Sequence, residues 1–140
     1  VYTLSETASD AEAARLAESE NRADAIAGID LSEEPSEVAD ILIDLLQRET
    51  RSFSIRFARN LVHEMKGVAP LHRNPVKSAG FKVLKAPDVP SVLVELGYVS
   101  NKHDLSNLKS NDWRARTVAS IAQAIDGFFA KRVVAKGAAN

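Results

Sequence analysis

At residues 91–97 the chain reads SVLVELG, a short apolar run that ends in a carboxylate followed by a glycine. Consecutive valine and leucine residues between Pro90 and Gly97 are typical of a strand that is buried on both faces. Such strands occur in parallel sheets that helices cover on either side, so this stretch predicts an α/β fold. Glu95 is the charged residue of the run, and burying its carboxylate is costly unless a partner satisfies it.

Helical and extended patterns alternate on either side of this stretch. We expect helices at residues 10–26, 35–65, 102–108 and 112–129, a strand at 81–85, and a partial strand at 1–5. Residues 29–34 read as a loop, residues 70–80 as a polar, turn-rich connection, and residues 133–140 as a frayed tail. The order of elements predicts a mainly parallel sheet flanked by helices.

Helical periodicity also predicts which helix faces are buried. In the 35–65 helix the apolar positions are Val38, Ile41, Leu42, Leu45, Leu46, Ile55, Ala58, Leu61, Val62 and Met65. In the 112–129 helix they are Val118, Ile121, Ala122, Ile125 and Phe128. The 10–26 helix starts at a capping box of Ser9 and Glu12 and carries mostly alanines, so we expect it to be mobile and loosely docked.

Composition places the chain among ordinary globular domains. Its 140 residues are 45% hydrophobic and 26% charged, which is enough apolar material for a buried core. No apolar run approaches the roughly 20 residues of a membrane-spanning helix, and the opening residues 1–5 lack the features of a signal peptide. The absence of cysteine excludes a thiolate metal site and a cysteine nucleophile. We predict no nucleic-acid partner for a chain whose net charge is −1.

The small net charge hides a strong asymmetry along the chain. Residues 1–50 hold 13 acidic and 3 basic residues, whereas residues 51–140 hold 6 acidic and 15 basic residues. An acidic segment folded back over a basic surface would explain this division, as would two partners of opposite charge. Solvated helix faces that differ in sign explain it equally well.

Glu95 is the position that most directly suggests chemistry. In open α/β sheets, ligands bind beyond the carboxyl ends of the strands, where this residue is predicted to lie. A carboxylate there is suited to acid–base catalysis. It is also suited to a purely structural role, in which loop amides donate hydrogen bonds to it. The residues alone leave both interpretations open.

A longer segment around Glu95 resembles a known family. Residues 79–101, AGFKVLKAPDVPSVLVELGYVSN, resemble the C-terminal signature of the zinc-dependent N-acetylmuramoyl-L-alanine amidases. The similarity extends to Glu20-Asn21, to residues 69–73, and into the closing helix, so it covers nearly all of the chain. Leu96 and Tyr98 stand where close relatives often carry other residues.

The resemblance implies a fold and an activity. It implies one α/β domain around a Zn²⁺ ion and hydrolysis of the amide between the lactyl group of muramic acid and the L-alanine of the stem peptide. Glu95 matches the catalytic glutamate of the family. It would take a proton from a water that zinc activates and pass that proton to the leaving nitrogen, since water bound to zinc can have a pKa of about 7.

The zinc ligands of the family are not found in this sequence. They are a histidine, a glutamate and a second histidine, and all three would lie upstream of Val1. The histidines present are His63, His72 and His103, none of which has a metal-type partner at short spacing. His63 is expected at a solvated or core-edge position, His72 in a structural or substrate-proximal one, and His103 on the surface. Residues 1–140 are therefore expected to be the C-terminal portion of a catalytic domain, inactive without its missing N-terminal portion.

The acidic segment at residues 11–49 suggests regulation. It resembles the helical insert of cell-division amidases, which blocks the active site until an activator with an EnvC-like or NlpD-like regulatory domain displaces it. Glu20 is the first candidate for a carboxylate that occupies the open position of zinc, and Glu18 is the second. Both are equally compatible with solvated helix positions. The resemblance thus implies an exported, periplasmic enzyme of cell separation.

Two other functions compete with this interpretation. In the amidase, Arg73 and Lys85 would face the anionic wall polymer or be merely solvated. A degenerate amidase fold without zinc would instead bind peptidoglycan or recruit a partner. A helical adaptor centred on residues 35–65 would explain the long helix but leave Glu95 unexplained. A His-Gly-Gly-type motif, a glutamate and a second histidine upstream of Val1 would favour the enzyme.

Overall fold

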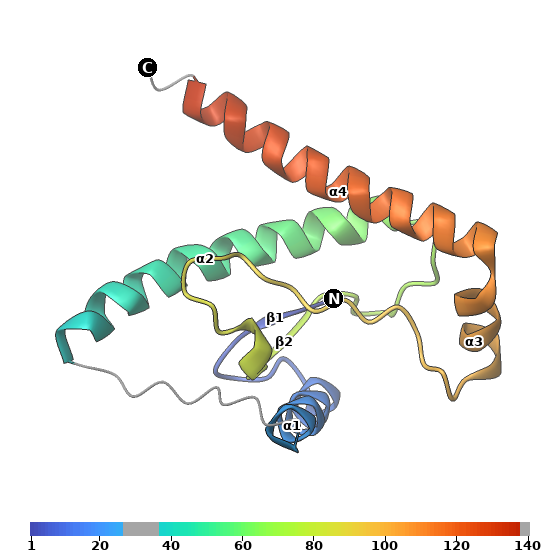
Figure 1. The fold of residues 1–140 in the computed structure, drawn as a ribbon, viewed down its shortest axis with the longest axis horizontal. Coiled ribbons are helices and arrows are strands. Elements are labelled where there is room, and N and C mark those ends of the chain that lie inside the picture. Colours follow the sequence, from blue (N-terminus) through green and yellow to red (C-terminus); the bar gives the residue numbers. More distant parts are fainter. Residues whose placement is uncertain (27–36, 138–140) are drawn as a thin grey trace. The chain divides into compact units, whose positions relative to one another are not determined.

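The structure is a computed structural model that describes residues 1–26 and 37–137, with side chains described at residues 1–23 and 44–130. In chain order its elements are β1 (Tyr2–Leu4), α1 (Ala11–Ile26), α2 (Glu37–Glu64), β2 (Lys77–Ala79), the 3-10 helix η1 (Lys82–Leu84), α3 (Lys102–Lys109) and α4 (Asn111–Gly137) (Figure 1). The predicted loop at 29–34 and the helix start at Pro35 lie outside the described residues. None of the helices within this description is long and apolar enough to cross a membrane.

The chain divides into two compact units. The first contains Val1–Ala58 and Val76–Leu93, and the second contains Arg59–Pro75 and Val94–Asn140. Helix α2 contributes to both, because the division falls after Ala58.

The sheet of the first unit is built around β1. Strand β2 pairs with it in parallel, with Tyr2 opposite Lys77 and Leu4 opposite Ala79 (Figure 1). Tyr2 also forms an antiparallel bridge to Leu93, in which each amide donates to the other carbonyl at 2.8 and 3.0 Å. The predicted α/β class and the parallel pairing are confirmed, but β2 lies inside the segment that was expected to be a polar connection.

The predicted strand at residues 91–96 is wrong apart from the bridge at Leu93. The amide of Ser91 donates to the hydroxyl of Ser54 at 2.9 Å, instead of joining a strand ladder. Val92, Leu93 and Val94 are half-buried, so the expected burial on both faces is wrong as well.

The predicted strand at residues 81–85 is a 3-10 helix instead. Phe81 and Leu84 are both buried while Val83 is 55% exposed, which matches a repeat of three residues per turn and not the alternation of a strand. The amide of Lys82 donates to the side chain of Asn21 at 2.8 Å. This hydrogen bond from α1 holds the backbone at Lys82 in a tight turn. The β-prone composition of residues 81–85 gives no sign of such a long-range contact.

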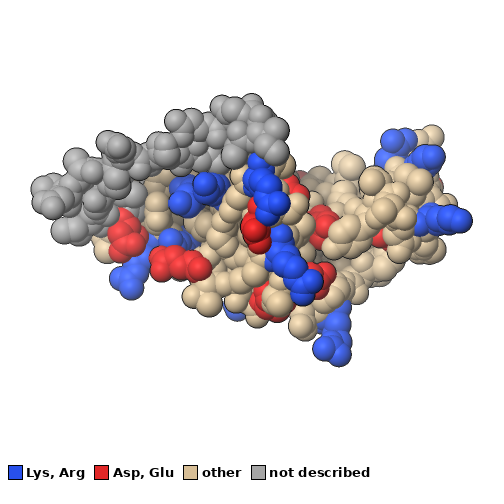
Figure 2. Space-filling view, turned by 90° about the horizontal axis from the view of Figure 1, so that it is seen from below, with Lys and Arg blue, Asp and Glu red and all other residues tan. Residues whose placement is uncertain are grey.

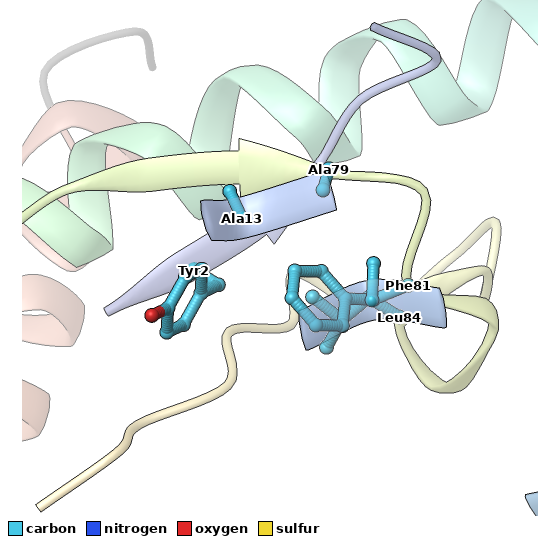
Figure 3. Close-up of a cluster of buried hydrophobic side chains, with 6 residues drawn as sticks. Tyr2, Ala13, Ala79, Phe81 and Leu84 are labelled. Atoms are coloured by element: carbon cyan, nitrogen blue, oxygen red, sulfur yellow. The ribbon is translucent and has the colours of Figure 1, made fainter. Parts of the chain in front are cut away.

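Helix α1 is anchored to the core of the first unit, so the expectation of loose docking is wrong. Ala13 and Ala17 are 0% and 4% exposed and belong to a cluster with Tyr2, Ala79, Phe81 and Leu84. Figure 3 shows the rings of Tyr2 and Phe81 in this cluster, and their centroids lie 5.3 Å apart in an edge-to-face arrangement. Alanines let the helix backbone approach the sheet closely, which a count of large apolar residues misses.

The start of α1 is fixed by charges. Asp10 accepts a hydrogen bond from the amide of Ala13 at 2.8 Å and therefore caps the helix, a role that the sequence had assigned to Ser9. Lys77 of β2 is 6% exposed, and its ammonium lies 2.6 Å from Glu12 and 3.4 Å from Asp10. Its hydrogen bond to Glu12 raises the pKa of Lys77, and the amide of Ala13 lowers the pKa of Asp10.

Ion pairs join the acidic N-terminal segment to bases from later in the chain. Besides the contacts of Lys77, Arg51 lies 3.5 Å from Glu6 within the same unit. Figure 2 shows acidic and basic side chains beside one another on the described surface. Some acids of residues 1–50 are therefore paired with bases from residues 51–140 within the first unit, as expected for an acidic segment folded over basic residues.

Helix α4 in the second unit buries Phe128 as predicted, but its other buried residues differ from those predicted. Its buried residues are Trp113, Thr117, Ser120, Ala124 and Phe128, whereas Val118 and Ile125 are 64% and 40% exposed. Asn60 of α2 donates to the carbonyl of Ala124 at 2.9 Å, so the two helices meet at this position. The helix continues to Gly137, so residues 133–137 of the predicted frayed tail are helical, and residues 138–140 lie outside the described residues.

Helix α2 matches the prediction in its second half. Ala58, Leu61, Val62 and Met65, just past its end, are buried as expected. Leu45 and Leu46, which were assigned to the same buried face, are 64% and 50% exposed. The side chains of Val38, Ile41 and Leu42 lie outside the described residues.

Candidate functional site

Glu95 lies in the second unit, on irregular backbone between the bridge residue Leu93 and helix α3. Its side chain is half-buried, and the hydroxyl of Tyr98 donates a hydrogen bond to Oε2 over 3.3 Å. A carboxylate in this position is oriented by the protein and still reached by solvent, which are both requirements for exchanging protons with a bound molecule.

The segment that carries Glu95 is held by the first turn of α3. The amide of Tyr98 donates to Oδ2 of Asp104 at 3.0 Å, and its carbonyl accepts from the amide of Asn101 at 3.0 Å. Asn101 in turn caps α3, because its side chain accepts from the amides of His103 and Asp104 at 2.9 and 3.2 Å. The loop and the helix start therefore form one hydrogen-bonded structure.

Gly97 makes this arrangement possible. Its φ is +155°, and a Cβ built there would lie 3.0 Å from Cβ of Asp104 and 3.2 Å from Cγ. A side chain at this position would push against the carboxylate that holds Tyr98. The glycine that follows Glu95 by two residues thus permits close contact between the loop and α3.

Glu18 and Glu20 lie on α1 in the first unit, and both are exposed. Glu18 forms an ion pair with Arg22, one helical turn later, over 2.9 Å. An exposed pair of this kind contributes little to stability. Neither acid is held by a hydrogen-bonded loop of the kind that surrounds Glu95.

Asn21, next to Glu20, has a structural role that sequence reasoning missed. Its side-chain amide donates to the carbonyl of Gly80 at 2.8 Å, and its oxygen accepts from the amide of Lys82 at 2.8 Å. These two bonds tie α1 to the turn between β2 and η1. The pair Glu20-Asn21 therefore combines an exposed acid with an anchored amide.

The remaining candidates are at the surface. His63, His72 and His103 are all exposed, as are Arg73 and Lys85. The ring of His72 accepts from the amide of Asn74 at 3.0 Å, which is a local turn contact. Among the side chains of residues 1–23 and 44–130, no group of three or more histidine, aspartate or glutamate residues is arranged to hold a metal ion. The described residues by themselves therefore do not fit a zinc site.

Comparison with known proteins defines the class. A family model described as N-acetylmuramoyl-L-alanine amidase matches residues 3–127, which span both units and include the whole loop from Glu95 to Asp104. The chain belongs to this amidase family.

Individual relatives agree with the family match. The chain is 34% identical over 131 residues to the N-acetylmuramoyl-L-alanine amidase AmiC of Escherichia coli O6:H1, covering 93% of this chain and 31% of the relative. It is 35% identical over 130 residues to AmiA of Escherichia coli K12, covering 92% and 45%. AmiC of Neisseria meningitidis serogroup B is 32% identical over 138 residues, covering 98% and 33%. The chain thus spans 31–45% of the length of these relatives.

Sequence reasoning found Glu95 but missed the residues around it. Asp104 contacts Tyr98 only because the loop turns back onto α3, and the spacing of the residues gives no direct sign of this. The available signals were Gly97, which indicates a close approach, and Asn101, which is a favourable helix cap. Read together, they would have suggested a loop packed against a helix start.

Proposed function

We propose that the protein is a peptidoglycan hydrolase that cleaves the amide between N-acetylmuramic acid and the L-alanine of the stem peptide, as an exported enzyme of cell separation in the periplasm. The family match over residues 3–127 carries this proposal. The names of the relatives support it, since they are N-acetylmuramoyl-L-alanine amidases that align with nearly all of this chain.

In the proposed reaction Glu95 transfers the proton. Water adds to the carbonyl carbon of the lactyl group, and Glu95 accepts a proton from that water as it adds. Glu95 then gives the proton to the amide nitrogen while the C–N bond breaks, which leaves a carboxylic acid on the sugar and an amino group on L-alanine. The half-buried position and the contact with Tyr98 support this role, because a proton carrier must be held in one orientation.

Zn²⁺ is the proposed cofactor of the complete protein. Its ligands would have to come from outside the described residues, since these contain no cluster that fits a metal. Zinc content measured on the full-length protein, beside the 140-residue chain, tests this requirement. We expect zinc in the full-length protein alone, and zinc bound stoichiometrically by the short chain would contradict the assignment of the ligands.

Glu95→Gln in the full-length protein tests the catalytic proposal. Glutamine keeps the shape of the side chain but cannot accept and return a proton, so we expect muropeptide release to fall by about 10³-fold or more. The zinc content and the melting temperature should match those of the wild-type protein. Activity within about tenfold of wild type would remove Glu95 from the mechanism.

Regulation by residues 11–49 is part of the proposal. Glu20, or failing that Glu18, would occupy the active site until an activator with an EnvC-like or NlpD-like regulatory domain displaces it. The exposure of both acids supports this, because neither is committed to the core. Leu45 and Leu46, two consecutive residues of α2, are also exposed and offer an apolar surface for such an activator.

The packing of α1 limits where this regulation can act. Ala13, Ala17 and Asn21 are tied to the sheet and to η1, so deleting all of residues 11–49 would damage the fold as well as remove a block. Substitution of single exposed acids is the cleaner test. Binding of peptidoglycan without any cleavage would favour the alternative, a zinc-free binding module.

A further inference from the structure

We propose that Tyr98 is a positioning residue that holds the carboxylate of Glu95 in its reactive orientation through the hydroxyl. The inference rests on the proposed function of Glu95. It concerns the hydroxyl of Tyr98, a residue that stands where close relatives often carry other residues. The supporting observation is the hydrogen bond from the Tyr98 hydroxyl to Oε2 of Glu95 over 3.3 Å.

The backbone of Tyr98 is fixed from two directions. Its amide donates to Asp104, and its carbonyl accepts from Asn101, both at 3.0 Å. Because these two partners belong to the capped first turn of α3, the backbone of Tyr98 cannot shift without disturbing the start of that helix. The phenol ring is therefore attached to a rigid base.

From that base the ring extends back to a residue three positions earlier in the chain. Gly97 allows the return, since its φ of +155° turns the backbone and its missing side chain leaves room for Asp104. Asp104 therefore acts on Glu95 through Tyr98. It fixes the backbone amide of Tyr98, and the Tyr98 hydroxyl in turn fixes the carboxylate of Glu95. The chain of contacts is Asp104, Tyr98 and Glu95, all in the second unit.

The exposure of the ring separates this role from simple packing. Tyr98 is 49% exposed, so its ring adds little to a core, and a phenylalanine would keep whatever packing exists. The hydroxyl is the part of the side chain that reaches the carboxylate. A hydrogen bond to a carboxylate restricts its rotation, and a proton carrier displaced by about 1 Å can lose a large part of its rate.

Tyr98→Phe in the full-length protein tests the proposal. We expect kcat for muropeptide release to fall about three- to tenfold, with KM and melting temperature unchanged, because only the orientation of Glu95 is affected. Val99→Ala is the matched control, since Val99 is the next residue, is 74% exposed, and has no part in this chain of contacts. An unchanged kcat overturns the proposal, and so does a rise in KM alone, which would indicate a contact with substrate.

A second measurement detects the hydrogen bond without using activity. The alkaline absorbance transition of the Tyr98 phenol can be isolated by subtracting the spectra of Tyr98→Phe. In a Glu95→Gln background this transition should move to lower pH, because a nearby carboxylate opposes formation of the phenolate. An unmoved transition overturns the contact. An inactive wild-type protein overturns the proposed function and with it the role of Tyr98, whereas an active protein with an unaffected Tyr98→Phe variant overturns only that role.

Discussion

The acids of α1 and the acid of the loop after Leu93 are held in very different ways. Glu18 and Glu20 project from a helix into solvent, and the contact of Glu18 is with Arg22 on the same helix surface. Glu95 lies on a loop that is hydrogen-bonded to the start of α3, with its carboxylate held by Tyr98. A group that transfers protons benefits from a fixed position, whereas a group that blocks a site must be able to leave it. The comparison therefore agrees with the roles proposed for the two regions.

The backbone is held by hydrogen bonds in both regions, although the acidic side chain is held in only one of them. In the first unit Asn21 ties α1 to the turn before η1 with two hydrogen bonds. In the second unit Asp104 and Asn101 hold the loop at Tyr98. Each region thus has a rigid frame, and the difference lies in whether the frame reaches the acid itself.

Gly97→Ala should have the largest effect. A Cβ at this position would lie 3.0 Å from Cβ of Asp104, so the loop must shift and carry Glu95 with it. We expect kcat/KM for peptidoglycan hydrolysis by the full-length protein to fall about ten- to hundredfold. Gly67→Ala is the matched control, because φ at Gly67 is also positive, at +80°, while a Cβ there meets nothing within 4 Å. Equal losses of activity in the two variants would show that strain alone, and not displacement of the loop, is responsible.

Asn21→Ala should destabilise the first unit while leaving the loop of Glu95 unaltered. The substitution removes two hydrogen bonds to the backbone of Gly80 and Lys82, and we expect a loss of about 1–3 kcal/mol in the free energy of unfolding. Chemical denaturation measures this loss. Ser19→Ala, at an exposed position on the same helix, serves as the control and should change stability by less than about 0.5 kcal/mol. A stability unchanged by Asn21→Ala would mean that α1 is not anchored in this way.

Glu20→Gln should raise the basal rate of hydrolysis, measured without any activator, by about threefold if its carboxylate blocks the active site. Glu18→Gln is the natural comparison, since Glu18 is exposed on the same helix and already paired with Arg22. The reverse order, with Glu18→Gln the more active variant, would transfer the blocking role to Glu18. Basal rates unchanged in both variants would contradict the regulatory proposal for these acids.

The pH dependence of stability should show the smallest effect. The pKa of Asp10 is lowered from 3.8, so its contribution is present above that pH and is lost as the pH falls through the folded-state value. The pKa of Lys77 is raised from 10.5, so its contribution is present below that pH and is lost as the pH rises through the folded-state value. Unfolding measured from pH 2 to 11.5 should therefore show losses at both ends. Lys77→Met should flatten the alkaline loss, and an alkaline loss of equal size in that variant would exclude Lys77 as its source.

Helices were predicted well from sequence, and short strands were not. Helix α1 was expected at residues 10–26 and is found at Ala11–Ile26, because a run of helix-forming residues follows a polar helix start. Strand β2 has the sequence KSA, which carries no apolar signal, and its position is set by pairing with β1 and by contacts with Ser9. Strands of this length depend on their partners, so a local pattern cannot locate them.

The buried face of α4 shows a second limit of sequence reasoning. Large apolar residues were assumed to face inward, yet Thr117 and Ser120 are buried while Val118 is exposed. Trp113 and Phe128 are buried on the same face, so neither residue size nor hydrophobicity alone identifies it. In the candidate site, Glu95 was found from its place after an apolar run. Its contact with Tyr98 depends on a backbone turn, which no spacing rule specifies.

Identification of the bond that is cut tests the central claim most directly. Purified peptidoglycan is incubated with the full-length protein, and the released products are analysed by mass spectrometry together with labelling of new amino groups. We expect stem peptides that begin with a free amino group on L-alanine, and glycan strands that keep intact lactyl carboxylates. Cleavage within the glycan or within the peptide, or binding to peptidoglycan with no release at all, would contradict it.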